Sequence, residues 1–171
     1  MGIRLALGFG LLVFIGCHNT TEIVVEPTPQ LIYTNSFESP NDTVGWSGQG
    51  EWSIYPEGSP DGGTHSLSVR GIDVGPQAEK VLQAPMENGQ FIFRFWARCL
   101  VQTGGLVRLI SLAPVAPYPS AGFGIVDSVW KSYSDTASFP AGYNLRIWID
   151  GNGAFGTPIL VDRIEILKIV K

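Results

Sequence analysis

Residues 90–99, Gln-Phe-Ile-Phe-Arg-Phe-Trp-Ala-Arg-Cys, decide the fold class because their side chains alternate in kind. Successive side chains of a β-strand point to opposite faces of a sheet. One face therefore holds Phe91, Phe93, Phe95 and Ala97, and the other holds Ile92, Arg94, Trp96 and Arg98. Residues 144–150 alternate in the same way, with Leu145, Ile147 and Ile149 opposite Arg146, Trp148 and Asp150. Both patterns predict a strand with one face in a core.

Strand-like segments recur along the rest of the chain, and turns rich in Gly and Pro separate them. No stretch of ten or more residues after Cys17 shows an amphipathic helical period. About ten short strands without helices predict an all-β sandwich or barrel. The predicted strands are Leu31–Phe37, Glu51–Tyr55, His65–Val69, Glu79–Gln83, Gln90–Cys99, Gly105–Leu112, Phe123–Val126, Lys131–Phe139, Asn144–Asp150 and Ile159–Ile169.

The first seventeen residues predict a secretory signal. One positive charge, Arg4, precedes an apolar run, Leu5–Gly16, that is too short to span a bilayer permanently. Cys17 follows, and Phe14-Ile15-Gly16-Cys17 resembles the bacterial lipobox, in which this cysteine is lipidated. An ordinary signal peptide with an incidental cysteine is the alternative.

The lipobox predicts a chain in three parts. Residues 1–16 are the signal peptide, and residues 17–30 are the lipidated Cys17 and a tether stiffened by Pro27 and Pro29. Residues 31–171 are long enough for one domain with a proper core. Lipidation of Cys17 leaves Cys99 as the second of two cysteines, so no intrachain disulfide is expected. We expect Cys99 to be a small buried residue.

Charge and motifs exclude several classes of function. The chain has a net charge of −4 and no cluster of Lys and Arg, which argues against nucleic acid as a partner. It has no nucleophile elbow and no His-Glu-x-x-His motif, so we expect no enzyme. A pair of carboxylates for glycoside hydrolysis stays open as an alternative.

The polar faces of the two alternating strands combine Trp with charged side chains. A sugar packs its C–H face on an aromatic ring, while guanidinium and carboxylate groups bind its hydroxyls. If the two strands are neighbours in one sheet, they form one patch, and three Arg against one Asp favour an anionic glycan. The alternative is that loops cover both rings and that the Arg side chains pair with carboxylates. The candidate ligand-binding residues are Arg94, Trp96, Arg98, Arg146, Trp148 and Asp150.

The order of several segments resembles the jelly-roll carbohydrate-binding modules of families four, nine and twenty-two, in the galactose-binding-like group. The matching segments are Asn35-Ser36-Phe37-Glu38, Gly45-Trp46, Gly63-Thr64-His65-Ser66-Leu67-Ser68-Val69, Phe91–Arg98, Trp130-Lys131-Ser132-Tyr133 and Ile159–Ile166. The resemblance covers residues 31–171 and implies a jelly-roll β-sandwich of two antiparallel sheets. It also implies a structural role for Trp130. Trp46 is expected at the edge of the core.

The resemblance also implies a structural calcium ion near the first and last strands. Glu38 and Asp162 would supply carboxylates, and backbone carbonyls near Ser36 and His65 would complete the site. Calcium takes six to eight oxygen ligands, which carboxylates and carbonyls provide. The alternative is that both carboxylates lie in surface turns.

These observations predict a bacterial lipoprotein whose domain binds a glycan, a polysaccharide or an oligosaccharide, without catalysis. The predicted location is the cell envelope, on the outer membrane, because His18 instead of Asp follows Cys17. One alternative is a structural or adhesion lipoprotein that uses the same fold to contact a protein partner in the envelope. Another is a small glycan hydrolase or lyase.

Overall fold

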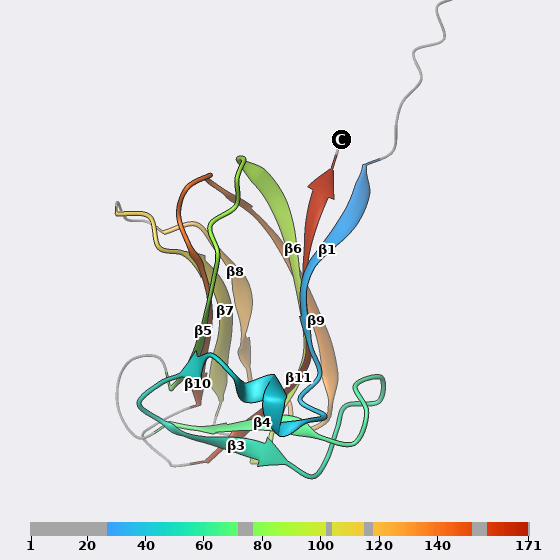
Figure 1. Cartoon of the computed structure of the whole chain (residues 1–171). Helices are drawn as coiled ribbons and strands as arrows, with labels where there is room; N and C mark the ends of the chain where they lie inside the picture. The colour runs from blue at the N-terminus through green and yellow to red at the C-terminus, as the bar shows by residue number, and fades with distance from the viewer. Residues whose placement is uncertain (1–26, 72–76, 102–103, 115–117, 152–156, 171) are drawn as a thin grey trace, which may run out of the picture.

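The computed structural model describes residues 27–71, 77–101, 104–114, 118–151 and 157–170. They form two antiparallel sheets packed face to face (Figure 1). Sheet A has the order β3-β4-β11-β6-β9, with β1 also paired to β11, and sheet B has the order β2-β5-β10-β7-β8. The strands of sheet A are β1 (Thr28–Asn35), β3 (Glu51–Tyr55), β4 (Ser66–Arg70), β6 (Gly89–Cys99), β9 (Lys131–Phe139) and β11 (Ile159–Val170). Those of sheet B are β2 (Trp46–Ser47), β5 (Ala78–Leu82), β7 (Gly105–Ser111), β8 (Ser120–Ile125) and β10 (Leu145–Gly151).

This architecture confirms the predicted all-β sandwich, with small differences at strand ends. The described residues also contain a short 3-10 helix, η1 (Pro40–Thr43), and the short β2, neither of which was predicted. Ser39 caps η1 through its side chain, which accepts a hydrogen bond from Asn41 N–H. No helix in the described part is long and apolar enough to cross a membrane.

The core lies between the sheets and consists of the apolar faces that the alternation predicted. The rings of Phe93 and Phe95 lie 5.0 Å apart between their centroids, and Phe95 stacks on Tyr133 at 5.2 Å. Sheet B contributes aliphatic side chains from β10 and β7. Burial of these side chains supplies the main stabilising free energy of a fold that has no disulfide within its described residues. The side chain of Cys99 is fully buried, as predicted, and Trp46 is in the core at 7 % exposure.

The first strand begins three residues before the predicted domain boundary. Thr28, Pro29 and Gln30 pair with Val170, Ile169 and Lys168 of β11, so they belong to sheet A and not to a tether. Two prolines had favoured a tether, but Pro29 is tolerated here because β1 lies at a sheet edge. The predicted signal peptide, Cys17 and residues 18–26 lie outside the described residues.

A β-bulge in β11 changes which side chains face the core. The pairing of β11 with β6 shifts between Asp162 and Glu165, and Arg163 takes a positive φ of 44°. Asp162 pairs with Trp96 and so lies on the outward face of sheet A. Ile164, after the bulge, points into the core. The bulge thus places Asp162 at a bend of the strand, where a loop can reach it.

Candidate functional site

The outward face of sheet B has one row of side chains that crosses all five strands. Ser47 pairs with Glu79, Glu79 with Trp148, Trp148 with Arg108, and Arg108 with Gly122. Arg146 and Asp150 flank Trp148 along β10 on the same face, because Ile147 and Ile149 between them point into the core. We call this surface the sheet B face; it is formed by Ser47, Glu79, Arg108, Gly122, Arg146, Trp148 and Asp150.

Trp148 and Arg108 form the centre of the sheet B face. The Arg108 guanidinium carbon lies 5.1 Å from the centroid of the Trp148 ring, within the range of a cation–π contact. Gly122 leaves room for Arg108, since a Cβ at this glycine would lie 2.8 Å from Arg108 Cγ. Gly122 N–H donates a hydrogen bond of 3.0 Å to Asp135 Oδ2 of β9, which fixes β8 at the edge of the sheet.

Carboxylates lie on both sides of this centre. Glu79 Oε2 and Arg146 Nε are 3.2 Å apart, and the two side chains are 20 % and 25 % exposed. This is an ion pair without the alignment of a hydrogen bond. Burial raises the pKa of Asp150, and the nearby charge of Arg108 opposes that rise. The face therefore has two guanidinium groups and two carboxyl groups.

Several polar atoms of the sheet B face have no hydrogen-bond partner. Eight buried side-chain nitrogen and oxygen atoms of the described residues lack one, and four of them are on this face: Glu79 Oε2, Arg108 Nε, Arg146 Nε and Trp148 Nε1. Native proteins satisfy most buried polar atoms with protein groups or ordered water, so each of these four atoms requires an explanation. An aromatic ring flanked by two guanidinium groups and two carboxyl groups marks this face as the candidate site.

The predicted single patch does not form, because its two strands belong to different sheets. Arg94, Trp96 and Arg98 lie on β6 in sheet A, whereas Arg146, Trp148 and Asp150 lie on β10 in sheet B. Their polar faces point away from the core on opposite sides of the sandwich. The strands share a pattern but are not neighbours, so alternation alone could not place them together.

Trp96 lies beside a small hollow on the outward face of sheet A. This hollow of about 180 Å³ is lined by Asp61, Arg94, Phe95, Trp96, Ser132, Arg163 and Glu165. In the described part of the chain Arg94 is exposed and forms no hydrogen bond or ion pair. Arg163 Nε is 3.4 Å from Glu165 Oε1.

Arg98 pairs with a carboxylate, which is the alternative to a ligand role that the sequence left open. Its guanidinium is 2.6 Å from Glu57 Oε2, lies over the Trp130 ring at 5.6 Å, and is only 17 % exposed. Trp130 Nε1 donates a hydrogen bond of 2.9 Å to Glu57 Oε1. The three side chains hold residues 56–65 against sheet A, and we call this segment the covering loop. The structural role of Trp130 agrees with what the resemblance implied.

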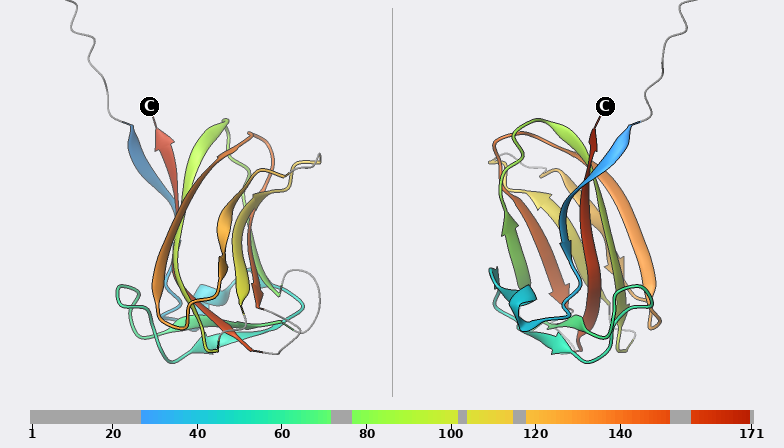
Figure 2. Two further views of the ribbon diagram at one scale, coloured as in Figure 1. Left: turned by 180° about the vertical axis from the view of Figure 1, so that it is seen from behind. Right: turned by 45° about the vertical axis from the view of Figure 1, so that its right-hand side comes forward.

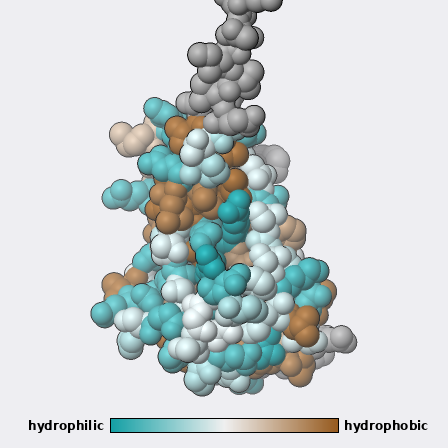
Figure 3. Space-filling view, turned by 90° about the vertical axis from the view of Figure 1, so that its right-hand side faces the viewer, coloured by the Kyte–Doolittle hydropathy of each residue, from teal (hydrophilic) through white to brown (hydrophobic). Residues whose placement is uncertain are grey.

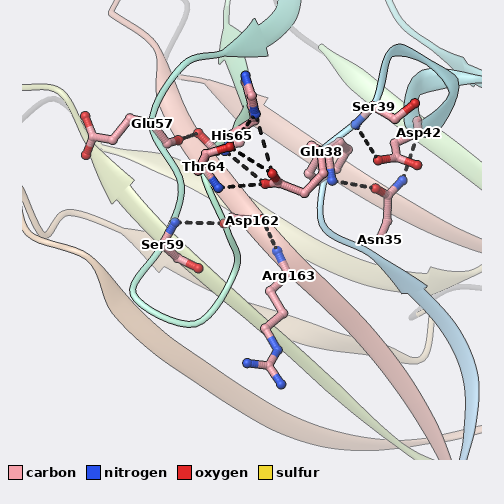
Figure 4. Close-up of polar contacts among 12 residues, drawn as sticks. Asn35, Glu38, Ser39, Asp42, Glu57, Ser59, Thr64, His65, Asp162 and Arg163 are labelled. Atoms are coloured by element: carbon pink, nitrogen blue, oxygen red, sulfur yellow. Dashed lines mark hydrogen bonds and ion pairs between the residues drawn. The ribbon is translucent and has the colours of Figure 1, made fainter.

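The two carboxylates predicted as calcium ligands lie close to the covering loop (Figure 4). Glu38 Oε1 accepts hydrogen bonds of 2.9 Å from the backbone N–H groups of Thr64 and His65, and Oε2 accepts one of 3.0 Å from Thr64 Oγ1. The two backbone hydrogen bonds are the main cause of a pKa of Glu38 lowered to about 2. Thus Glu38 stays ionised and holds the end of the covering loop.

Asp162 is buried beneath the same loop. Its Oδ2 accepts a hydrogen bond of 2.8 Å from Ser59 N–H, and its Oδ1 accepts one of 2.6 Å from Arg163 N–H. Burial raises the pKa of Asp162, and the nearby charge of Glu38 raises it further. The two predicted metal-binding carboxylates are therefore close enough to influence each other.

The donor set around Glu38 and Asp162 suits a hard cation. Gly62 lies directly against the Asp162 carboxylate and Gly63 against the Glu38 carboxylate, and a Cβ at either glycine would collide with that group. Ser59 Oγ is buried beside Asp162. Calcium binds carboxylate, hydroxyl and carbonyl oxygens of this kind. Among the described residues, no three His, Cys, Asp or Glu side chains gather as a metal cluster, so any ion here would rely on backbone and hydroxyl oxygens.

Four residues of the sheet B face were missed in the sequence: Ser47, Glu79, Arg108 and Gly122. Glu79 and Arg108 stand in predicted strands, and Arg108 alternates with the core residues Val107 and Leu109. The signal for Arg108 was its outward place in an otherwise apolar strand. The sequence did not show that Arg108 lies beside Trp148, because the spacing of strands along the chain does not predict their order in a sheet.

The fold is similar to that of solved carbohydrate-binding modules. No protein-family model and no curated protein matches the sequence. The CBM22-1 xylan-binding domain of Paenibacillus barcinonensis Xyn10C is 14 % identical with a TM-score of 0.64, over 86 % of this chain and 99 % of that one. The CBM22-1 and GH10 modules of Clostridium thermocellum Xyn10B, complexed with xylohexaose, have 12 % identity and a TM-score of 0.55, over 82 % and 29 %.

An enzyme also shares this fold. The Stig cyclase Fisc from a Fischerella species is 14 % identical with a TM-score of 0.57, over 82 % of this chain and 98 % of that one. At these identities the likeness shows the fold alone, a jelly-roll sandwich of the type seen in carbohydrate-binding modules. Function depends on the side chains that each protein places on that fold.

Proposed function

We propose that the chain is a lipid-anchored protein of the bacterial envelope that binds a glycan, without catalysis, on the sheet B face. The observation that supports this function is the row Glu79–Trp148–Arg108, in which a carboxyl group and a guanidinium group flank an aromatic ring. A pyranose stacks on such a ring, and its hydroxyls act as both donors and acceptors for guanidinium and carboxylate groups. Cys17 would be the acylated residue.

The charge of the sheet B face favours a neutral glycan. The anionic preference expected from the sequence required Arg94, Arg98 and Arg146 to share one patch. Arg94 and Arg98 are on the other sheet, and Arg146 is paired with Glu79. Arg108 and Arg146 are balanced by Glu79 and Asp150. We therefore replace that expectation with a neutral glycan rich in hydroxyl groups.

The test compares Trp148 with Trp96, one from each outward face. Full-length protein in detergent micelles is titrated calorimetrically with xylohexaose, cellohexaose and oligogalacturonate. Trp148→Ala should weaken binding by about thirtyfold, since an aromatic anchor contributes about 2 kcal/mol. Trp96→Ala is the matched control and should bind as the unchanged protein does. Equal affinity of Trp148→Ala and the unchanged protein, with both folded, would reject the site.

A second candidate function is glycan hydrolysis on the same face. The observation in its favour is that Glu79 is ion-paired whereas the pKa of Asp150 is raised by burial, since two carboxyls in unlike environments can serve as base and acid. Release of reducing ends from xylohexaose during the titration would support hydrolysis. Binding without any release would support a binding protein.

A further inference from the structure

The two ends of the sandwich differ in composition. The described chain enters beside Val170, at the end where loops 83–88 and 140–144 and residues 112–114 and 118–119 also lie (Figure 2). We call this the entry end. Its three loops contain one charged residue, Glu87, and that carboxylate is 3.2 Å from Lys168 Nζ. The loops at the opposite end contain the acidic residues Glu38, Asp42, Glu57, Asp61 and Asp127.

The entry end also exposes large apolar side chains. Met86 is 94 % exposed and Tyr143 is 38 % exposed, and they come from two different loops of this end. Tyr118, from the third loop, and Val170 are exposed as well. The opposite end also exposes apolar side chains, namely Val44, Val101, Val126 and Val129, but its loops carry the acidic residues given above. The entry end differs in having exposed apolar residues on loops almost without charge, which favours contact with an apolar partner.

Apolar surface continues from the entry end onto the outward face of sheet A. Leu31 pairs with Leu167, and Leu167 pairs with Ile92, so these three side chains form one row across β1, β11 and β6. Leu31 is 53 % exposed, and Ile32 at the adjacent bulge is 49 % exposed. Figure 3 shows hydrophobic surface gathered in the half of the molecule near the entry end and mostly hydrophilic surface in the other half.

We propose that the entry end rests on the interface of a lipid bilayer and orients the domain on the membrane. This inference rests on the lipid anchor proposed above. Residues 17–26 separate the proposed acylated Cys17 from the described chain, and ten residues span at most about 35 Å when fully extended. The anchor therefore keeps the entry end within about 35 Å of the bilayer.

The physical chemistry of the two ends favours this orientation. Met and Tyr side chains are stable in the headgroup region, where apolar groups leave water and the phenol remains hydrated. The acidic end would be repelled by anionic lipids, whose surface potential acts over about one Debye length. The sheet B face then stands on the side of the domain, open to a glycan in the surrounding envelope.

The test measures which end approaches the lipid. Acylated full-length protein is reconstituted in phosphatidylcholine–phosphatidylglycerol vesicles and labelled with NBD at Asn144→Cys, at the entry end, or at Asn41→Cys, at the opposite end. Cys99 is buried and should not react under native conditions. A nitroxide headgroup lipid should quench the label at position 144 by about twofold or more, and leave the label at position 41 nearly unchanged.

Variants separate insertion from simple tethering. Met86→Glu combined with Tyr143→Glu should abolish the quenching at position 144 although the protein still floats with the vesicles. Val44→Glu, an exposed apolar residue of the opposite end, is the matched control and should change nothing. Equal quenching at both positions, or quenching that the double variant does not reduce, would overturn the orientation alone. Loss of flotation in the unchanged protein would overturn the anchor and, with it, the orientation.

Discussion

The two outward faces of the sandwich began from the same sequence pattern and differ in how their polar groups are satisfied. On sheet A, Asp162, Arg98 and Glu38 all bind groups of the protein itself, and the covering loop lies over them. Leu160, which pairs with Ser68 and Arg98, is fully buried there. On the sheet B face, Arg108 lies over the Trp148 ring and Arg146 pairs with Glu79, so the charged groups contact neighbouring strands instead of a loop.

This difference shows that a strand face with Trp and Arg points away from the core, but that the pattern does not predict whether the face binds a ligand. On sheet A, Arg98 and Asp162 bind groups of the covering loop, whereas on the sheet B face the charged groups contact side chains of neighbouring strands. Such faces are distinguished by the groups that their polar side chains contact. The predictions below test the contrast between the covered face of sheet A and the sheet B face, beginning with the largest effect.

The largest effect is expected from replacing Asp162, one of two carboxyl groups whose pKa values burial raises. Asp162→Ala removes the acceptor for Ser59 N–H and Arg163 N–H beneath the covering loop. Leaving a buried backbone donor unpaired costs about 1–3 kcal/mol, so the variant should lose about 3 kcal/mol of unfolding free energy. Denaturant titration in the presence of a chelator measures this loss.

Asp150→Ala is the matched variant on the sheet B face. Its carboxyl group accepts no described hydrogen bond and interacts with Arg108 by charge alone. Removal of a desolvated carboxylate without partners should change stability by less than about 1 kcal/mol. Similar losses in both variants would show that the two faces are equally structural and would contradict the contrast.

Calcium should stabilise the covered face if Glu38, Asp162 and Ser59 hold an ion. A ligand that binds only the folded state adds about 2.7 kcal/mol at a hundredfold excess over its Kd. The melting temperature should therefore fall when a chelator is added, and Glu38→Gln should reduce that fall. Calorimetry checks this, and an identical melting temperature with calcium and with chelator would exclude a structural ion.

A smaller effect should separate the two arginines of β6. Arg98→Met removes the ion pair with Glu57 and the contact with Trp130, and a partly buried charged hydrogen bond of this kind contributes about 1.5 kcal/mol. Arg94→Met, in an exposed position, should stay within about 0.5 kcal/mol of the unchanged protein. Denaturant midpoints of the two variants give the answer, and equal midpoints would refute the structural role of Arg98.

The sequence predicted the core more completely than the site. Phe91, Phe93 and Phe95 point inward because strand alternation is local and has a period of two. The placement of Trp148 beside Arg108 depends on which strands become neighbours, and that order follows from long-range packing. The nearness of Glu38 and Asp162 was implied by resemblance to a family, but their backbone donors follow from the conformation of one loop.

The smallest effect is the pH dependence that Glu38, at the end of the covering loop, gives to the free energy of unfolding. The pKa of Glu38 is lowered from 4.5 to about 2 by the N–H groups of His65 and Thr64, so the folded state favours its ionised form. A carboxylate with a lowered pKa stabilises the fold fully above its unfolded value and loses this contribution as the pH falls through its folded value. The unchanged protein should therefore have a higher free energy of unfolding than Glu38→Gln, by an amount that is constant above about pH 5 and shrinks as the pH falls toward 2.

Asp162 has a raised pKa, which acts in the opposite sense, but it is present in both proteins and its contribution largely cancels in their difference. Chemical denaturation at a series of pH values measures this difference. A gap between the two proteins that is the same at pH 3 and pH 7 would show that Glu38 does not hold the covering loop by its charge.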